Sequence, residues 1–177
     1  MKKIKINKKK GILFWITGLS GTGKTSIGRN IKKDIVKNYG PTLVVSGDDI
    51  RNAFNLNKYD KISRLIIGKQ YTRFCKILTN QNINIIFSVI GLFHELQKYN
   101  RLSIKNYVEI YIKADLFKVK KISKKKHYNK KTPNVLGLDI KPEIPKNPHI
   151  IIENDFKNSK SVISKNLFKI IKKKLIY

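Results

Sequence analysis

Residues 12–25 read ILFWITGLSGTGKT, an apolar run followed by a loop rich in glycine. The loop matches the phosphate-binding pattern G-x-x-x-x-G-K-[ST] at Gly18, Leu19, Ser20, Gly21, Thr22, Gly23, Lys24 and Thr25. Residues 12–17 suit a buried strand, and residues 25–38 have the apolar period of a helix. Glycine lets backbone N–H groups approach phosphate oxygens, and the start of a helix favours an anion. The pattern and its flanks therefore predict a nucleoside triphosphate site.

We expect residues 18–26, Ser26 included, to bind ATP. Lys24 is predicted to reach the β- and γ-phosphates as a catalytic cation, and the Thr25 hydroxyl to bind Mg²⁺. The loop alone does not say how the nucleotide is used. Larger ATPases carry an Asp at the end of a second apolar strand, whereas residues 83–89 have Ser88 there. A small-molecule kinase is the class that fits this chain.

Outward from the loop, apolar runs alternate with longer amphipathic stretches. Strands are predicted at residues 12–17, 42–46, 83–89, 107–112 and 150–153. Helices are predicted at residues 25–38, 49–54, 63–79, 94–100, 115–122 and 159–175. Strands that are apolar throughout and alternate with helices indicate a parallel sheet covered on both faces. The predicted fold is the α/β fold of P-loop kinases: a five-stranded, mainly parallel sheet, helices on both faces, and a lid.

The chain has 177 residues, which suits a single domain spanning residues 1–177. Within it we distinguish a basic N-terminal tail at residues 1–10, a lid at about residues 118–148 and the C-terminal helix. One cysteine, Cys75, excludes an internal disulfide, which favours a reducing, cytoplasmic setting. No segment has the roughly 18 apolar residues of a membrane span, so no membrane association is expected.

The charge is strongly positive: Lys and Arg number 39 and Asp and Glu 11, a net charge of +28. Only five of the 39 are arginines, and 34 lysines, 29 isoleucines and 17 asparagines make up much of the chain. This composition is that of A/T-rich codons. Proteins that recognise nucleic acids more often use arginine for bidentate contacts. We therefore expect no specific nucleic-acid partner, although the field should attract anionic nucleotides.

From residue 12 to about residue 153 the chain resembles the adenylyl-sulfate kinase (APS kinase) family. FWITGLSGTGKT is similar to that family's first strand and phosphate loop, and SGDDIR at residues 46–51 to its D-G-D-N-x-R segment. YVEIYIKADL and LGLDIKPEIP, at residues 107–116 and 136–145, are similar to its fourth strand and lid segment. The resemblance implies transfer of the ATP γ-phosphate to a ribose 3′-OH, with Asp48 orienting or deprotonating that hydroxyl. By itself, Asp48 could instead cap the short helix that follows.

The resemblance also implies a set of residues that bind the phosphoryl acceptor. Arg51 and Arg64 are expected to hold its acidic groups, and Tyr59 takes the place of a Phe that stacks on its base. The expected acceptor-binding residues are Arg51, Tyr59, Arg64, Ile67, Val89, Ile90, Tyr128, Lys130, Val135 and Leu136. The basic lid could close over the phosphates or be a solvated run of charge. A homodimer is left open.

Three departures from the family pattern fall on or near this acceptor site. Ser46 replaces the first Asp of D-G-D, Ile67 replaces an Asn that contacts adenylyl sulfate, and Val135 replaces a Phe of the base clamp. A site that loses a hydrogen-bonding partner for one base generally stops preferring that base. A related branch of the family phosphorylates cytidine diphosphoramidate in the synthesis of capsule phosphoramidate. We favour that acceptor, with adenylyl sulfate as the alternative.

Two rival hypotheses remain. The chain could be another small kinase of the same fold, acting on a sugar or a nucleotide. It could also be a non-catalytic P-loop protein that binds nucleic acid through its charge, in which case Asp48 would be dispensable and duplex binding would be sensitive to salt.

Overall fold

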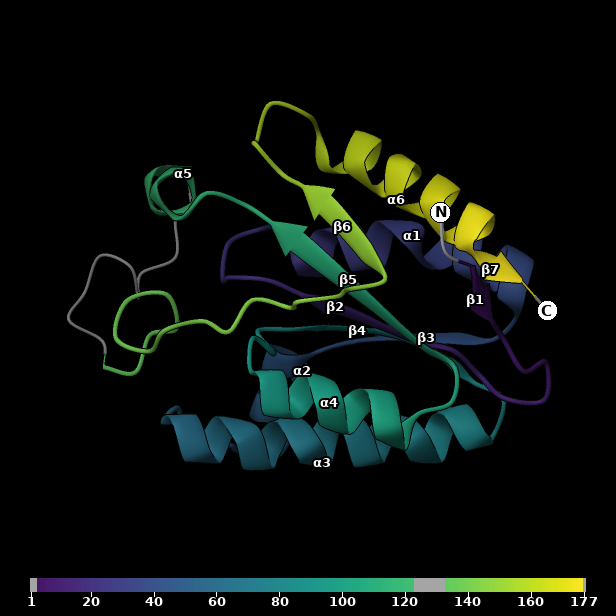
Figure 1. Cartoon of the computed structure of the whole chain (residues 1–177), viewed down its shortest axis with the longest axis horizontal. Coiled ribbons are helices and arrows are strands. Elements are labelled where there is room, and N and C mark those ends of the chain that lie inside the picture. The colour runs from purple at the N-terminus through teal and green to yellow at the C-terminus, as the bar shows by residue number, and fades with distance from the viewer. Residues whose placement is uncertain (1–2, 123–132, 177) are drawn as a thin grey trace.

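The computed structural model describes residues 3–122 and 133–176, which form an α/β fold (Figure 1). In chain order the elements are β1 (Ile4–Lys5), β2 (Leu13–Thr17), α1 (Lys24–Tyr39), β3 (Thr42–Ser46), α2 (Gly47–Ala53), α3 (Lys61–Asn80), β4 (Asn84–Val89), α4 (His94–Ser103), β5 (Tyr107–Lys113), α5 (Leu116–Ile122), β6 (Ile150–Glu153), α6 (Lys160–Lys174) and β7 (Leu175–Ile176). The predicted elements are confirmed, with ends that differ by up to three residues.

Five strands form one sheet in the order β3-β4-β2-β5-β6. Every pairing in it is parallel, which confirms the predicted sheet. The central strand is β2, paired with β4 from Leu13↔Ile85 to Thr17↔Val89 and with β5 on its other side. The glycine loop leaves the carboxyl end of this strand, where open α/β sheets bind their ligands. Sheet order thus places the loop beside the ends of β4 and β5, with the end of β3 one strand beyond β4.

Helices cover both faces of the sheet, α1 and α6 on one and α3 and α4 on the other (Figure 1). The side chains of β2 alternate between two buried clusters. Phe14 and Ile16 belong to the cluster that includes α1 and α6, whereas Leu13 and Trp15 belong to the one that includes α3 and α4. This alternation explains why the strand is apolar throughout: a strand between two helical layers has no face in water.

The chain termini are joined by a second, two-stranded sheet that the sequence did not indicate. Strand β1, within the predicted basic tail, pairs in parallel with β7 at the end of the chain. The Asn106 side chain secures the segment that follows β1, accepting a hydrogen bond from Asn7 N and donating to the carbonyls of Asn7 and Lys10 at 2.8–2.9 Å. Strands of two residues are too short to show a periodic pattern, so only their pairing reveals them.

The predicted lid is described at its two ends. Helix α5 occupies its beginning, and residues 123–132 lie outside the described residues. Residues 133–148 run without helix or regular strand back to β6, apart from a bridge between Leu136 and Ile140. Glu143 fastens this return segment, because its carboxylate accepts from His94 N at 2.7 Å and from Lys61 Nζ at 3.2 Å. The return segment is therefore tied to the N-terminal ends of α3 and α4.

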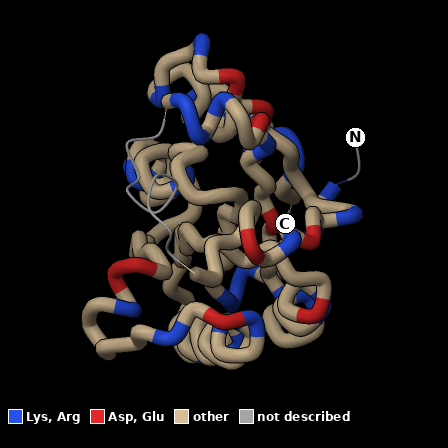
Figure 2. Tube along the Cα trace, turned by 90° about the vertical axis from the view of Figure 1, so that its left-hand side faces the viewer, with Lys and Arg blue, Asp and Glu red and all other residues tan. Residues whose placement is uncertain are grey.

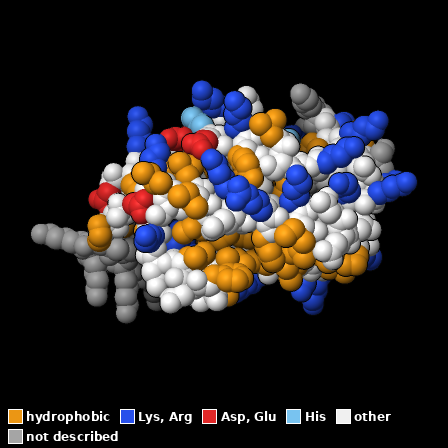
Figure 3. All heavy atoms as spheres, turned by 90° about the horizontal axis from the view of Figure 1, so that it is seen from below, with side chains coloured by type: hydrophobic (Ala, Val, Ile, Leu, Met, Phe, Trp, Pro, Cys, Tyr) orange, Lys and Arg blue, Asp and Glu red, His pale blue; other side chains and the backbone are white. Residues whose placement is uncertain are grey.

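Lysine and arginine are distributed over many elements (Figure 2). The face covered by α3 also carries apolar side chains (Figure 3), and on that helix Ile62, Ile66 and Ile77 are exposed. None of the helices among residues 3–122 and 133–176 is long and apolar enough to cross a membrane.

Candidate active site

The glycine loop has the backbone that its sequence requires. Gly21 and Gly23 have φ of 81° and 86°, in the left-handed region that residues with a side chain seldom adopt. Gly23 is the N-cap of α1, and no side chain caps the helix. The first N–H groups of a helix lack partners within it, so the uncapped start of α1 suits an anion.

Six of the predicted ATP-binding residues line a cavity of about 890 Å³: Ser20, Gly21, Gly23, Lys24, Thr25 and Ser26. Gly18, Leu19 and Thr22 do not line it; they shape the loop from inside. The Leu19 carbonyl accepts hydrogen bonds from Lys24 Nζ at 2.6 Å and from the Thr22 hydroxyl at 2.9 Å. A side chain on Gly18 would collide with the Ile112 carbonyl, 2.6 Å from its Cβ position. The loop is thus folded against β5 on one side and open to the cavity on the other.

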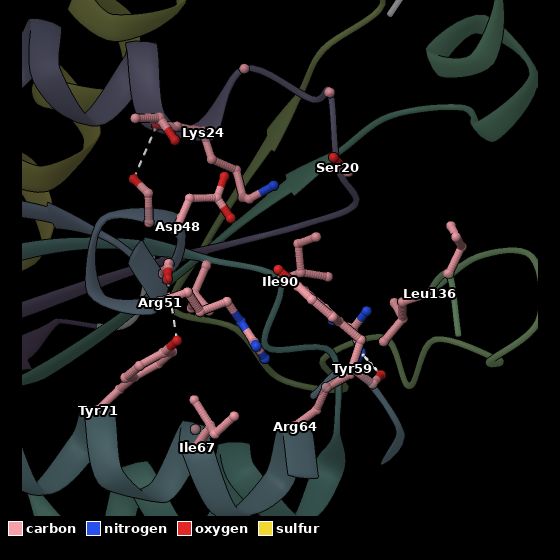
Figure 4. Close-up of a pocket in the computed structure, with 18 of the residues that line it drawn as sticks. Ser20, Lys24, Asp48, Arg51, Tyr59, Arg64, Ile67, Tyr71, Ile90 and Leu136 are labelled. Carbon is pink, nitrogen blue, oxygen red and sulfur yellow. Dashed lines mark hydrogen bonds between the residues drawn. The ribbon is translucent and has the colours of Figure 1, made fainter. Parts of the chain in front are cut away.

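Asp48 enters the same cavity from the first turn of α2 (Figure 4). The helix is capped by Ser46, whose hydroxyl accepts from Asp49 N at 3.2 Å while the Asp49 carboxylate accepts from Ser46 N at 2.8 Å. This capping box explains why a serine stands at residue 46, and it gives Asp49 a structural role. The capping role that the sequence left open for Asp48 therefore belongs to its neighbours.

Arg51, Tyr59 and Arg64 form a cationic cluster that lines the cavity across from the phosphate loop (Figure 4). The guanidinium carbons of Arg51 and Arg64 lie 4.3 and 5.3 Å from the centre of the Tyr59 ring. Arg51 also donates to the carbonyls of Leu56 and Lys58. Burial and, next, the charge of Arg51 lower the pKa of Arg64. Two guanidinium groups held this close together suit a ligand with more than one negative charge.

Tyr59 and Arg64 also take part in contacts that the sequence did not suggest. Arg64 donates to the carbonyls of Tyr59 and Asn134, the second at 2.9 Å, which links α3 to the return segment. The Tyr59 ring supports guanidinium groups, so the base stacking predicted for it stays a prediction.

The N-K-Y-D sequence at residues 57–60 has the pattern with which GTPases read guanine. Here Asp60 caps α3, accepting from Ser63 N at 2.9 Å.

The remaining described acceptor residues make an apolar wall: Ile67, Val89, Ile90, Val135 and Leu136 all line the cavity. The structure thus brings these residues together with the phosphate loop, Asp48 and the two arginines. Tyr128 and Lys130 lie outside the described residues. In the described part of the chain no cluster of three His, Cys, Asp or Glu could hold a metal ion.

Tyr71, Phe156 and Lys160 are among the cavity-lining residues that sequence reasoning missed. Tyr71 stands one turn after Ile67 on α3, so helical spacing from a predicted site residue could have found it. Phe156 and Lys160 follow β6 and reach the cavity beside the phosphate loop. The carbonyl of Thr22 accepts a hydrogen bond from the Asn154 side chain at 3.0 Å, which ties this segment to the loop. No local pattern signals that interaction.

The sequence profile of the family described as adenylylsulphate kinase matches residues 10–153. The cytidine diphosphoramidate kinase of Campylobacter jejuni subsp. jejuni serotype O:2 is 32% identical over 151 residues, which are 83% of this chain and 88% of that protein. The adenylyl-sulfate kinase of Clostridium kluyveri is 28% identical over 166 residues, 89% of this chain and 82% of that protein.

Among solved structures, the APS kinase of Mycobacterium tuberculosis in complex with AMPPNP and APS has a TM-score of 0.82. The match covers 92% of this chain and 98% of that chain at 19% identity, which establishes a shared fold.

Proposed function

The chain belongs to the adenylylsulphate kinase family and is a phosphotransferase, and we propose that it moves the γ-phosphate of ATP to the ribose 3′-OH of a nucleotide-linked small acid. The acceptor we favour is cytidine diphosphoramidate. The observation that carries the proposal is a single cavity in which the phosphate loop faces Asp48 and two arginines. Such an arrangement suits phosphoryl transfer, which asks mainly for positioning and for charge around the transferred group.

The phosphate loop binds the phosphoryl donor. Lys24 stabilises the charge on the transferred phosphate, with its ammonium group positioned by the Leu19 carbonyl. Thr25 lines the cavity at the start of α1, and its hydroxyl is the kind of oxygen ligand that Mg²⁺ accepts beside nucleotide phosphates and water. A magnesium ion held in that way needs no carboxylate cluster. When bound, it would neutralise phosphate charge during transfer.

The phosphoryl acceptor is bound and oriented by Asp48, Arg51 and Arg64. Asp48 orients the acceptor hydroxyl and takes its proton, while the arginines hold the acidic groups that link nucleoside to acid. The base then meets the apolar wall. Ile67 is 7% exposed and offers no hydrogen bond at the position where the family has an Asn. The missing hydrogen bond supports an acceptor other than the adenine nucleotide, and the Campylobacter relative bears the name of a cytidine diphosphoramidate kinase.

Adenylyl sulfate is the second candidate. The relatives from Clostridium kluyveri and Gloeothece citriformis carry the name adenylyl-sulfate kinase, at 28% and 26% identity. The phosphate loop, Asp48 and both arginines would serve either acceptor. The two candidates therefore differ in the base and the activated group, not in the transfer chemistry.

A product assay decides between them. Purified protein is given Mg-ATP with cytidine diphosphoramidate or with adenylyl sulfate, and ADP is followed together with the phosphorylated product. We expect turnover of the cytidine compound, and Lys24→Ala as the matched control should abolish it. Turnover of adenylyl sulfate alone would replace the favoured acceptor by the second one, and turnover of neither would overturn the proposal.

A further inference from the structure

Tyr71 lies where the apolar wall of the cavity meets α2. Its ring packs on Phe87 of β4 with 5.2 Å between ring centres, and the residue is 4% exposed. It lines the cavity one helical turn beyond Ile67, and both side chains rise from α3 toward Asp48 and Arg51 (Figure 4). Neither the sequence motifs nor the proposed roles of the other site residues account for its hydroxyl.

The Tyr71 hydroxyl donates a hydrogen bond to the carbonyl of Gly47 at 3.2 Å. That carbonyl and the amide nitrogen of Asp48 belong to the same peptide unit, which is planar. Any rotation of this unit would move the Asp48 backbone and redirect its carboxylate. The hydrogen bond therefore acts on Asp48 through one rigid peptide.

Gly47 itself lies in a close-packed place. A Cβ there would lie 3.1 Å from Val89 Cγ2, closer than most Cβ contacts, and 3.6 Å from Tyr71 Cε2, an ordinary van der Waals distance. Glycine leaves its own backbone freer than any other residue does. Helix α2 has seven residues, and its Ser46–Asp49 capping box holds the start of the helix from one side. Tyr71 supplies a second hold from the direction of α3.

We propose that Tyr71 is a positioning residue for phosphoryl transfer, holding the peptide between Gly47 and Asp48 so that the Asp48 carboxylate faces the acceptor hydroxyl. This inference rests on the proposed function. Burial raises the pKa of Tyr71 to about 12, with Asp48 and Tyr59 acting in the same direction and Arg51 and Arg64 against it. The hydroxyl consequently keeps its proton and remains a donor across the pH range of a kinase assay.

The test compares Tyr71→Phe with Tyr107→Phe. Tyr107 is also 4% exposed and its hydroxyl also donates a buried hydrogen bond, to Glu109 at 3.2 Å, but it does not line the cavity. We expect Tyr71→Phe to lower kcat about tenfold, the effect of removing one such hydrogen bond that supports the transition state, with the KM for ATP within about twofold. Tyr107→Phe should keep the wild-type kcat. An unchanged kcat in Tyr71→Phe would overturn the proposal.

A double-mutant cycle separates action through Asp48 from a direct effect. In the Asp48→Asn background, Tyr71→Phe should change the residual kcat less than about twofold, because coupled residues are not additive. A full additional decrease in that background would show that Tyr71 acts independently of Asp48 and would contradict the proposal.

A crystal structure of Tyr71→Phe gives a readout that needs no acceptor. We expect a rotated Gly47–Asp48 peptide and a displaced Asp48 carboxylate, and an unmoved peptide would overturn the inference. If the wild type turns over neither acceptor, the proposed function fails, and this structure still decides whether Tyr71 positions Asp48.

Discussion

Lys24 and Asp48 reach the cavity from different helices, α1 and α2, and both side chains extend into the same part of it (Figure 4). The donor phosphates and the acceptor hydroxyl must meet between such groups for in-line transfer. At this scale the sequence was most informative. The glycine pattern selected Lys24, and the resemblance of residues 46–51 to the family's D-G-D-N-x-R segment selected Asp48.

Asp48→Asn is the sharpest test of a single residue. The amide has the size of the carboxylate but cannot take a proton, so kcat should fall by about 10² or more while ATP binding is kept. Steady-state kinetics with varied ATP and varied acceptor would measure both. A variant that changed only KM would make Asp48 a binding residue.

At the scale of elements, the return segment at residues 133–148 is held by Glu143 between α3 and α4. The hydrogen bond from His94 N and then the interaction with Lys61 lower the pKa of Glu143 below its ordinary value of 4.5. A carboxyl whose pKa is lowered by folding stabilises the fold above its unfolded pKa. That contribution is lost as the pH falls through its folded value.

We therefore expect Glu143→Gln to lower the free energy of unfolding by no more than about 1 kcal/mol at pH 7, because water screens this partly exposed carboxylate. The difference from wild type should shrink as the pH falls below the ordinary pKa of 4.5. Urea unfolding at several pH values measures this. Glu153→Gln is the matched control, since Glu153 pairs with Lys113 at 2.9 Å but is largely exposed. A difference from wild type that did not shrink as the pH fell below 4.5 would rule out the ionised Glu143 as its source.

At the scale of the whole molecule, a buried polar network joins helices and strands behind the cavity. Glu109 of β5 is fully buried and accepts from Arg101 of α4 and from Tyr107, and Asn100 links Tyr107 to Thr72 of α3. Burial raises the pKa of Glu109, and the nearby Arg101 opposes this. The protonated carboxyl is thus the form that burial favours.

Arg101→Met should destabilise the fold by about 3 kcal/mol near neutral pH, because it leaves a buried carboxylate without its cation. The destabilisation should shrink as the pH falls, since a protonated Glu109 needs no partner. Thermal and urea unfolding would measure both effects. Arg101→Met combined with Glu109→Gln should recover part of the stability, while Arg73→Met, on the exposed side of α3, should cost little. A double variant as unstable as Arg101→Met would assign the cost to packing.

Local sequence alone determined the strands of the five-stranded sheet, the helices and the phosphate loop. Each of these depends on neighbours in the chain, through side-chain period, glycine placement and motif spacing. The Ser46–Asp49 capping box of α2 is equally local, but in the sequence Ser46 stood out only as the replacement of a family Asp.

Only the tertiary structure decided which distant groups meet. The hydrogen bond from Tyr71 to Gly47, the tie from Asn154 to the phosphate loop and the pairing of β1 with β7 join residues 24, 132 and about 170 positions apart. Such pairings follow from how helices and strands pack, and no local period encodes them. Sequence thus determined the groups that local motifs carry. Packing decided which further groups join the site and how each is held, because a side chain's partners depend on what the fold places beside it.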